Sequence, residues 1–162
     1  GLRETPARAA RSLAELTTPR PFRATTFPND GDPDGLVVVR DIAFHSLCEH
    51  HLLPFFGVAH VGYLPGDRIV GLSKLPRLVE ACSRGPHVQE RLTAEIADWL
   101  ERELAPRGVG VVLEATHLCM AARGARQASA VTVTQAFRGE MRDPILRAEV
   151  RAGAGTWRPP GT

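Results

Sequence analysis

The sequence predicts an α+β fold, with paired strands packed against an adjacent pair of helices. Two patterns indicate this fold. Apolar side chains recur with a period of two over 109–120, which is typical of a strand, and at helical spacing over 73–84 and 88–104. At 162 residues the chain is expected to form one domain with a substantial core, over residues 1–152, followed by a Gly/Pro-rich tail over 153–162.

The first part of the chain is expected to hold one helix, a connector and one strand. Residues 5–16 have a helical composition, with Thr5 as the expected N-cap and Pro6 in the first turn. Residues 17–35 contain several prolines and Asp/Gly turn signals, which predict a connector without regular structure. The β-branched run over 36–44 predicts the first strand.

Two further strands lead into the helix pair. Alternation predicts one strand over 55–64 and a short one over 68–72. Ser73 then suits the N-cap of a helix that a Gly-Pro pair ends. The apolar face of this helix includes Cys82, so we expect that thiol to lie in the core.

The longer helix over 88–104 ends at a proline and a glycine, and two strands follow it. In the strand over 109–120, the period of two places His117 and Cys119 on the same face as the apolar residues. A strand over 130–137 is expected to pair with it.

Composition excludes several classes of function. The formal net charge of +2 is too small to indicate nucleic acid or a membrane surface as a partner. The longest apolar stretch, over 52–64, contains Pro and Gly and is too short to cross a bilayer. Three cysteines without a disulfide-scaffold spacing fit a reducing compartment, and we expect a cytoplasmic protein.

The most informative pattern is a set of cysteines and histidines. Cys48 and His51 are three residues apart, so one tight turn can bring both onto one ion, and Cys119 could complete the set. Thiolate and imidazole are preferred ligands of zinc. A zinc ion with three protein ligands keeps a position for water, as in catalytic sites, whereas a structural site would take a fourth ligand, which His50 or His117 could supply.

The other histidines separate into two groups. His50 and His117 lie next to the expected ligands and either support them or act as general acids and bases, since imidazole titrates near neutral pH. His45, His60 and His87 have no partner pattern, and we expect them to be structural.

A second pattern indicates an anion site. Ser73, Lys74 and Arg77 open the first helix of the pair. Cations there oppose the helix dipole, but together with free backbone N–H groups they make a cradle for phosphate. The alternative is a capped helix with solvated cations.

Three other polar residues also allow two interpretations. Arg123 lies in a turn beside a glycine, as either a surface arginine or a contact to substrate phosphate. Gln89 and Glu90 open the longer helix, where sequence alone favours a solvated start. A buried glutamate there could instead accept paired N–H donors from a guanine edge.

Several motifs occur together in one order along the chain. They are Gly1-Leu-Arg-Glu-Thr-Pro6, Cys48-Glu-His-His51, His60-Val-Gly-Tyr-Leu-Pro65, Gly71-Leu-Ser-Lys-Leu75, Val88-Gln-Glu-Arg-Leu-Thr93, His117-Leu-Cys-Met120 and Arg123-Gly124. Over about residues 1–150 this series resembles the GTP cyclohydrolase I family.

The resemblance implies a fold, an assembly and a reaction. The fold is the tunnelling fold, an antiparallel sheet with two antiparallel helices on one side, here with an additional N-terminal helix. The assembly is a homo-oligomer, usually a decamer of two pentamers, with active sites between subunits. In the implied reaction, zinc-activated water attacks C8 of GTP, formate leaves, and the ring recloses as 7,8-dihydroneopterin triphosphate.

The resemblance also implies a role for each matched residue. The implied ligands of zinc (Zn2+) are Cys48, His51 and Cys119. The implied proton-transfer residues are His50 and His117. Glu90, with Gln89, is the implied reader of the guanine edge. The implied triphosphate contacts are Ser73, Lys74, Arg77 and Arg123. Two alternatives remain, namely a paralogue that opens GTP without forming the pterin and a non-catalytic assembly protein stabilised by zinc.

Overall fold

The computed structural model describes residues 1–31, 35–155 and 157–158, and its centre is a five-stranded sheet. In spatial order the strands are β5 (Pro86–His87), β2 (Val37–Cys48), β3 (Pro54–Leu64), β6 (Gly108–His117) and β7 (Thr132–Gly139). Neighbouring strands are antiparallel except β2 and β5, which are parallel over two residues. A smaller antiparallel sheet joins β1 (Thr26–Pro28) to β4 (Arg68–Val70).

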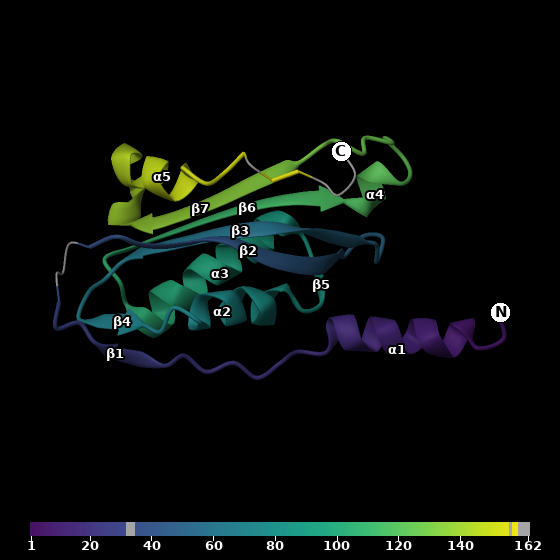
Figure 1. Cartoon of the computed structure of the whole chain (residues 1–162), viewed down its shortest axis with the longest axis horizontal. Helices are drawn as coiled ribbons and strands as arrows, with labels where there is room; N and C mark the ends of the chain where they lie inside the picture. Colours follow the sequence, from purple (N-terminus) through teal and green to yellow (C-terminus); the bar gives the residue numbers. More distant parts are fainter. Residues whose placement is uncertain (32–34, 156, 159–162) are drawn as a thin grey trace.

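Helices lie on both sides of the five-stranded sheet (Figure 1). Two of them, α2 (Lys74–Ser83) and α3 (Gln89–Leu104), cover one face, and α5 (Pro144–Arg151) lies on the other. A one-turn helix, α4 (Leu118–Ala121), follows β6 directly, and a 3-10 turn, η1 (Glu140–Arg142), precedes α5. None of the helices in the described ranges is long and apolar enough to span a bilayer.

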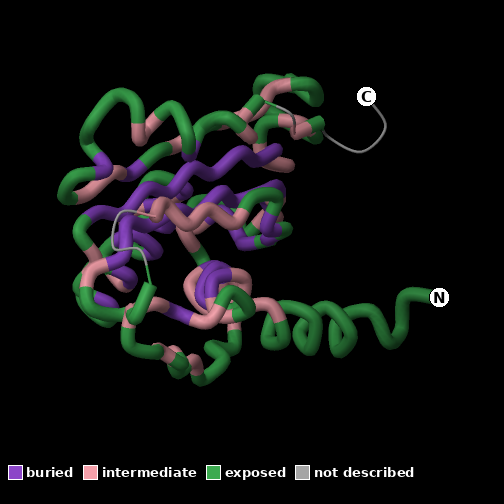
Figure 2. Tube along the Cα trace, turned by 60° about the vertical axis from the view of Figure 1, so that its left-hand side comes forward, coloured by how far each residue is buried: buried purple, intermediate pink, exposed green. Residues whose placement is uncertain are grey.

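The main core fills the space between the sheet and the helix pair. Val111 and Leu113 of β6 meet Leu92, Ile96 and Leu100 of α3 there, and all five side chains are fully buried. Figure 2 shows this buried band running along the central strands. The apolar alternation in this strand therefore marks the face that the helices cover.

A smaller cluster lies on the opposite face of the sheet. It joins Leu64 and Val112 to Met141 and to Val150 of α5. As a result β6 is buried on both faces, and its alternation does not separate a core face from a solvent face.

The N-terminal helix α1 (Thr5–Thr17) contributes no buried residue. It projects away from the sheet and helix layers, with an exposed surface along its length (Figure 2). Two contacts link its C-terminal end to α2: Arg84, just after α2, donates to the Glu15 carbonyl of α1 at 2.5 Å, and Arg20, just after α1, pairs with Glu80 of α2 at 2.8 Å.

Most expected elements are confirmed. The strands expected over 36–44, 55–64 and 68–72 correspond to β2, β3 and β4, and the helix pair to α2 and α3. The last two strands pair as expected, with Ala115 opposite Thr132. Cys82 packs against the main core, as its place on the apolar helix face predicted.

Other expectations were wrong. The N-cap of α1 is Glu4, and Thr5 is already helical. The connector contains β1. Its partner strand, β4, lies about 40 residues further along the chain, so the sequence around β1 does not indicate that it forms a strand. Helix α5 was not predicted, although Asp143 caps it and Pro144 is its first residue. The tail expected over 153–162 lies partly outside the described residues, at 156 and 159–162.

Candidate metal centre and active site

A tight turn at the end of β2 brings Cys48 and His51 together. The Cys48 carbonyl accepts from the backbone N–H of His51 at 3.3 Å and of Leu52 at 2.8 Å. The Cys48 N–H in turn donates to the Leu53 carbonyl at 2.8 Å, and Leu52 adopts a φ of 51°. This turn returns the chain into β3 and leaves the Cys48 Sγ 3.6 Å from the His51 Nδ1.

Cys119 reaches the same place from the end of β6. Phe55, at the start of β3, pairs with His117, so α4 begins at the same end of the sheet as the turn. The ligand atoms of Cys48, His51 and Cys119 all lie within 4.8 Å of one another. The expectation that Cys119 lies on the strand face was wrong, because β6 ends at His117 and Cys119 belongs to α4.

The spacing of Cys48 and His51 fits two ligands of a tetrahedral metal ion. With Zn–S near 2.3 Å and Zn–N near 2.05 Å, tetrahedral angles separate sulfur and nitrogen ligands by about 3.6 Å. The Cys48 Sγ to His51 Nδ1 distance has that value. In the described part of the chain, the compact group of ligand atoms contains three residues and does not include His50 or His117. A metal held here would keep an open coordination position.

The thiols also favour a cation. Burial raises the pKa of the Cys119 thiol, the hydrogen bond and charge of the neighbouring Cys48 raise it further, and Arg123 opposes the change. Two adjacent thiolates are therefore unfavourable on their own. A bound cation would remove that penalty, since metal binding deprotonates its thiol ligands.

Thiol labelling should separate the cysteines into two classes. Burial, with Glu95 adding and Arg102 opposing, raises the pKa of Cys82 to about 11. Thiolate is the reactive form, so Cys82 should react slowly throughout. We expect the zinc-loaded protein to resist dithiobis(nitrobenzoate), and chelation to make two thiols, Cys48 and Cys119, react faster than Cys82. A Cys82→Ala control should leave that count at two. A thiol count that does not change on chelation would contradict the assignment.

His117 is held firmly beside this cluster. Its ring stacks on Phe55, with centroids 4.5 Å apart and planes 5° from parallel, and its Nε2 lies 2.7 Å from the Gln89 Oε1. Burial lowers the pKa of His117, and the charge of Glu90 opposes that shift. The imidazole is therefore fixed in position and close to a carboxylate.

His50 is more accessible. Its side chain is 65% exposed, with Nδ1 3.9 Å from the Cys48 Sγ and Nε2 3.8 Å from a Glu49 carboxylate oxygen. Arg91, in the first turn of α3, donates to both oxygens of Glu49, at 2.9 and 3.4 Å. The Glu49–Arg91 ion pair thus links the turn that carries His50 to the start of α3.

Gln89 and Glu90 lie at this same end of the molecule but face different surroundings. Cys48 pairs with His87 in the sheet, which brings the start of α3 next to the turn that carries Cys48 and His51, called the metal turn below. Glu90 is exposed, whereas Gln89 is only 1% exposed and its amide is hydrogen-bonded inside the protein. Glu90 is therefore open to a ligand in the single chain, and the Gln89 side chain is not.

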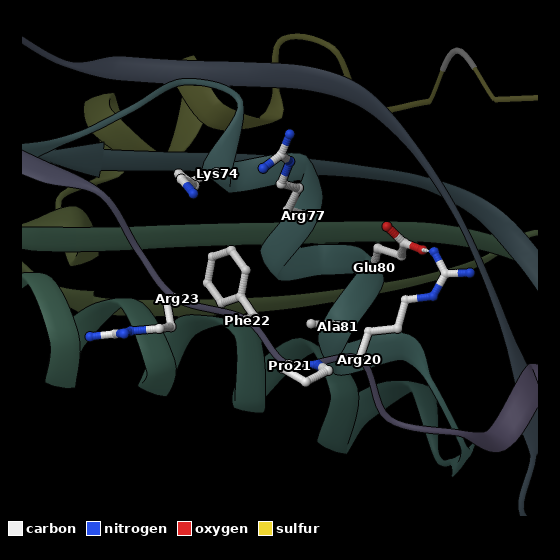
Figure 3. A pocket seen from close by; sticks show the side chains of 8 residues that line it. All are labelled: Arg20, Pro21, Phe22, Arg23, Lys74, Arg77, Glu80 and Ala81. Atoms are coloured by element: carbon white, nitrogen blue, oxygen red, sulfur yellow. Dashed lines mark hydrogen bonds and ion pairs between the residues drawn. The ribbon is translucent and has the colours of Figure 1, made fainter.

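The expected phosphate contacts gather at the other end of α2. Lys74 and Arg77 line a cavity of about 420 Å³ together with Arg20 and Arg23 of the connector (Figure 3). Ser73, directly before α2, is exposed, and its side chain makes no capping hydrogen bond.

One chain does not bring this basic cavity to the metal ligands. Helix α2 has ten residues, so at 1.5 Å per residue Lys74 lies roughly 13 Å along its axis from Ser83. The metal turn lies beyond the Ser83 end, where β5 pairs with β2 (Figure 1). Arg123 differs from the other cations, because it is exposed and lies just after α4, near Cys119.

The fold is that of a known structural class. The chain resembles the crystal structure of the archaeosine synthase QueF-Like in the apo form, with a TM-score of 0.53 and 16% identity, over 64% of this chain and 93% of that one. The antiparallel sheet with a helix pair on one face confirms the expected tunnelling fold. Fold and site together define a tunnelling-fold protein with a Cys-His-Cys group that could hold a metal ion.

Sequence comparison identifies the family. The family model of GTP cyclohydrolase I matches residues 1–154. The chain is 56% identical over 139 residues to GTP cyclohydrolase 1 of Sulfurihydrogenibium sp. (strain YO3AOP1), covering 86% of this chain and 74% of that protein. It is 56% identical over 153 residues to GTP cyclohydrolase 1 of Bifidobacterium longum (strain NCC 2705), covering 92% and 77%. The chain belongs to the GTP cyclohydrolase I family.

Proposed function

We propose that this chain is a GTP cyclohydrolase that hydrolyses GTP at C8, releases formate and recloses the ring as 7,8-dihydroneopterin triphosphate. The observation that carries the proposal is the three-residue ligand set, Cys48, His51 and Cys119, with two further imidazoles beside it. Membership of the family supports GTP as the substrate.

The proposed metal is zinc. Two thiols and one imidazole, with the Cys48 and His51 ligand atoms 3.6 Å apart, suit zinc better than magnesium or calcium, which prefer oxygen ligands. A zinc ion in this set would act as a Lewis acid and lower the pKa of a water ligand toward neutrality. Because the ligands are thiols that must stay reduced, we propose a cytoplasmic location.

His50 and His117 are the proposed proton-transfer residues. Opening the imidazole ring of guanine breaks C–N bonds at C8, and each departing nitrogen must gain a proton. An accessible imidazole at His50 and a fixed one at His117 are side chains of the kind that act as general acids and bases. Their separate surroundings suit two different proton transfers.

Glu90 is the proposed reader of the guanine edge. A carboxylate can accept two N–H donors from guanine and does not match the donor pattern of adenine. Its exposure in the first turn of α3, at the metal end of the molecule, supports this role. We do not assign the Gln89 side chain to guanine, because its polar atoms have partners within the protein.

Glu90→Gln should weaken recognition of GTP. We expect kcat/KM for GTP to fall about 100-fold, chiefly through KM, because the amide loses the charge and one of the two acceptors. Steady-state kinetics with GTP and with inosine triphosphate, which lacks the 2-amino donor, measure the change, and the preference for GTP should shrink. Glu101→Gln, exposed on the same helix, is the matched control. Unchanged kinetics in Glu90→Gln would refute the role.

We propose that Ser73, Lys74, Arg77 and Arg123 bind the triphosphate and that the active site lies between subunits. The separation of Lys74 from the metal ligands along α2 supports this arrangement. In a homo-oligomer, the metal end of one subunit can meet the basic cavity of its neighbour. A decamer of two pentamers is the assembly that we propose.

Incubation of the zinc-loaded protein with GTP tests the proposed function. Formate release and pterin fluorescence after oxidation are followed in parallel. Formate and neopterin together are the expected result. Formate without pterin would indicate a paralogue that stops after ring opening, and neither product would indicate a zinc-stabilised protein without this activity.

A further inference from the structure

The amide of Gln89 can adopt only one orientation in its surroundings. Its Nε2 lies 3.0 Å from the Thr132 carbonyl oxygen, 3.1 Å from the Thr134 Oγ1 and 3.3 Å from the Leu113 carbonyl oxygen. A flipped amide would place its oxygen against two carbonyl oxygens, which cannot donate. The Oε1 must therefore be the atom that faces the His117 Nε2, at 2.7 Å.

An amide oxygen accepts and never donates, so the partner nitrogen must carry the hydrogen. The His117 Nε2 is therefore protonated whether the ring is neutral or an imidazolium. The neutral tautomer with its hydrogen on Nδ1 would set two lone pairs against each other at a half-buried site. Among the described residues, the His117 Nδ1 has no hydrogen-bond partner.

The Gln89 side chain is itself held rigidly. It is 1% exposed at the first position of α3, and its amide bridges this helix to β6 and β7. Thr93 adds a second link, since its hydroxyl donates to the Gln89 carbonyl at 2.7 Å and lies 2.6 Å from the Thr134 hydroxyl. The stacking of His117 on Phe55 then fixes the plane of the ring.

We infer that Gln89 is a positioning residue that keeps a hydrogen on the His117 Nε2, so that His117 exchanges protons with the substrate through Nδ1 alone. The catalytic meaning of this inference rests on the proposed function. The tautomer itself does not, because it follows from contacts within the protein. It gives Gln89 a different role from the guanine contact that the family resemblance implied.

Replacement of Gln89 by methionine tests the inference, because it keeps the length of the side chain and removes the acceptor. With zinc-loaded enzyme we expect kcat for GTP to fall about 10- to 100-fold and KM to stay within about threefold. Magic-angle-spinning NMR of protein labelled with 15N-histidine reports the tautomer directly. His117, assigned by loss of its signals in His117→Ala, should be protonated on Nε2 in the wild type and only partly so in Gln89→Met.

Two further variants separate positioning from simple loss of stability. Thr134→Val removes one buried hydrogen bond from the same cluster but leaves the Gln89 oxygen facing His117, so kcat and tautomer should stay near wild type. Gln89→Glu retains an acceptor at His117 when its other oxygen is protonated and donates to the Thr132 and Leu113 carbonyls, and its kcat should then exceed that of Gln89→Met.

Several results would overturn the inference. An unchanged tautomer in Gln89→Met would remove its basis. A raised KM with normal kcat would make Gln89 a guanine contact, and an equal loss of kcat in Thr134→Val would make its role structural. If the wild type lacked activity with GTP yet showed the Nε2–H tautomer, the proposed function would fail while the positioning of His117 stood.

Discussion

Cys119→Ser is expected to remove the metal and to lower the rate of formate release from GTP by at least about 1000-fold. The compact ligand group in the described chain has three members, and serine cannot replace a thiolate at neutral pH. Two remaining ligands do not hold zinc well enough to survive dialysis. Zinc per chain, by plasma mass spectrometry, and formate release on the same sample measure the two effects.

Cys82→Ser is the matched control for Cys119→Ser. Cys82 lies on α2 and packs against the main core. It is not a member of the ligand group. Its replacement should leave zinc content and rate near wild type. A Cys119→Ser protein with full zinc content and full rate would refute the ligand assignment, and with it the three-ligand site.

Subunit mixing is expected to restore activity to two variants that are inactive alone. Cys48→Ser removes one member of the ligand group. Lys74→Ala removes a cation from the basic cavity at the other end of α2. If the active site lies between subunits, some interfaces in a mixed oligomer combine two intact halves. Random mixing should recover up to about a quarter of the wild-type rate. Formate release after co-refolding or co-expression gives the measurement.

The control for subunit mixing is a pair of variants with damage at the same end. Cys48→Ser mixed with Cys119→Ser should recover nothing, because both residues contribute to one ligand group within a chain. Native mass spectrometry establishes that mixed oligomers have formed. If such oligomers of Cys48→Ser and Lys74→Ala stayed inactive, a site between subunits would be contradicted.

The parts of the site that depend on local sequence were predictable. Cys48 and His51 are three residues apart, and a turn of that size brings them together whatever surrounds it. The helix pair was predictable because its apolar spacing is strong over two segments. The residues themselves also indicated Cys119 as the third ligand, and the resemblance to the family added the guanine role of Glu90 and the reaction itself.

The parts that depend on distant contacts were not predictable from patterns. Gln89 finds its partners 24 to 45 residues away, and no feature of its neighbours along the chain shows where they lie. The alternation of side chains that placed Cys119 on the strand continues two residues past the end of β6. A helical turn begins at Leu118 without any change in the apolar pattern of the sequence, so the pattern does not mark the end of the strand. Phe55, which stacks on His117, resembled an ordinary strand residue.

The exposed helix α1 has a consequence for how the chain unfolds. It has 13 residues and buries none of them, so its order does not share the cooperativity of the core. Isolated helices shorter than about 12–15 residues are marginal in water. Mutations in the core should therefore change the melting of the sheet and helix layers while leaving the fraying of α1 almost untouched. The lifetime of this helix is set by the surfaces that it meets and not by the stability of the domain that follows it.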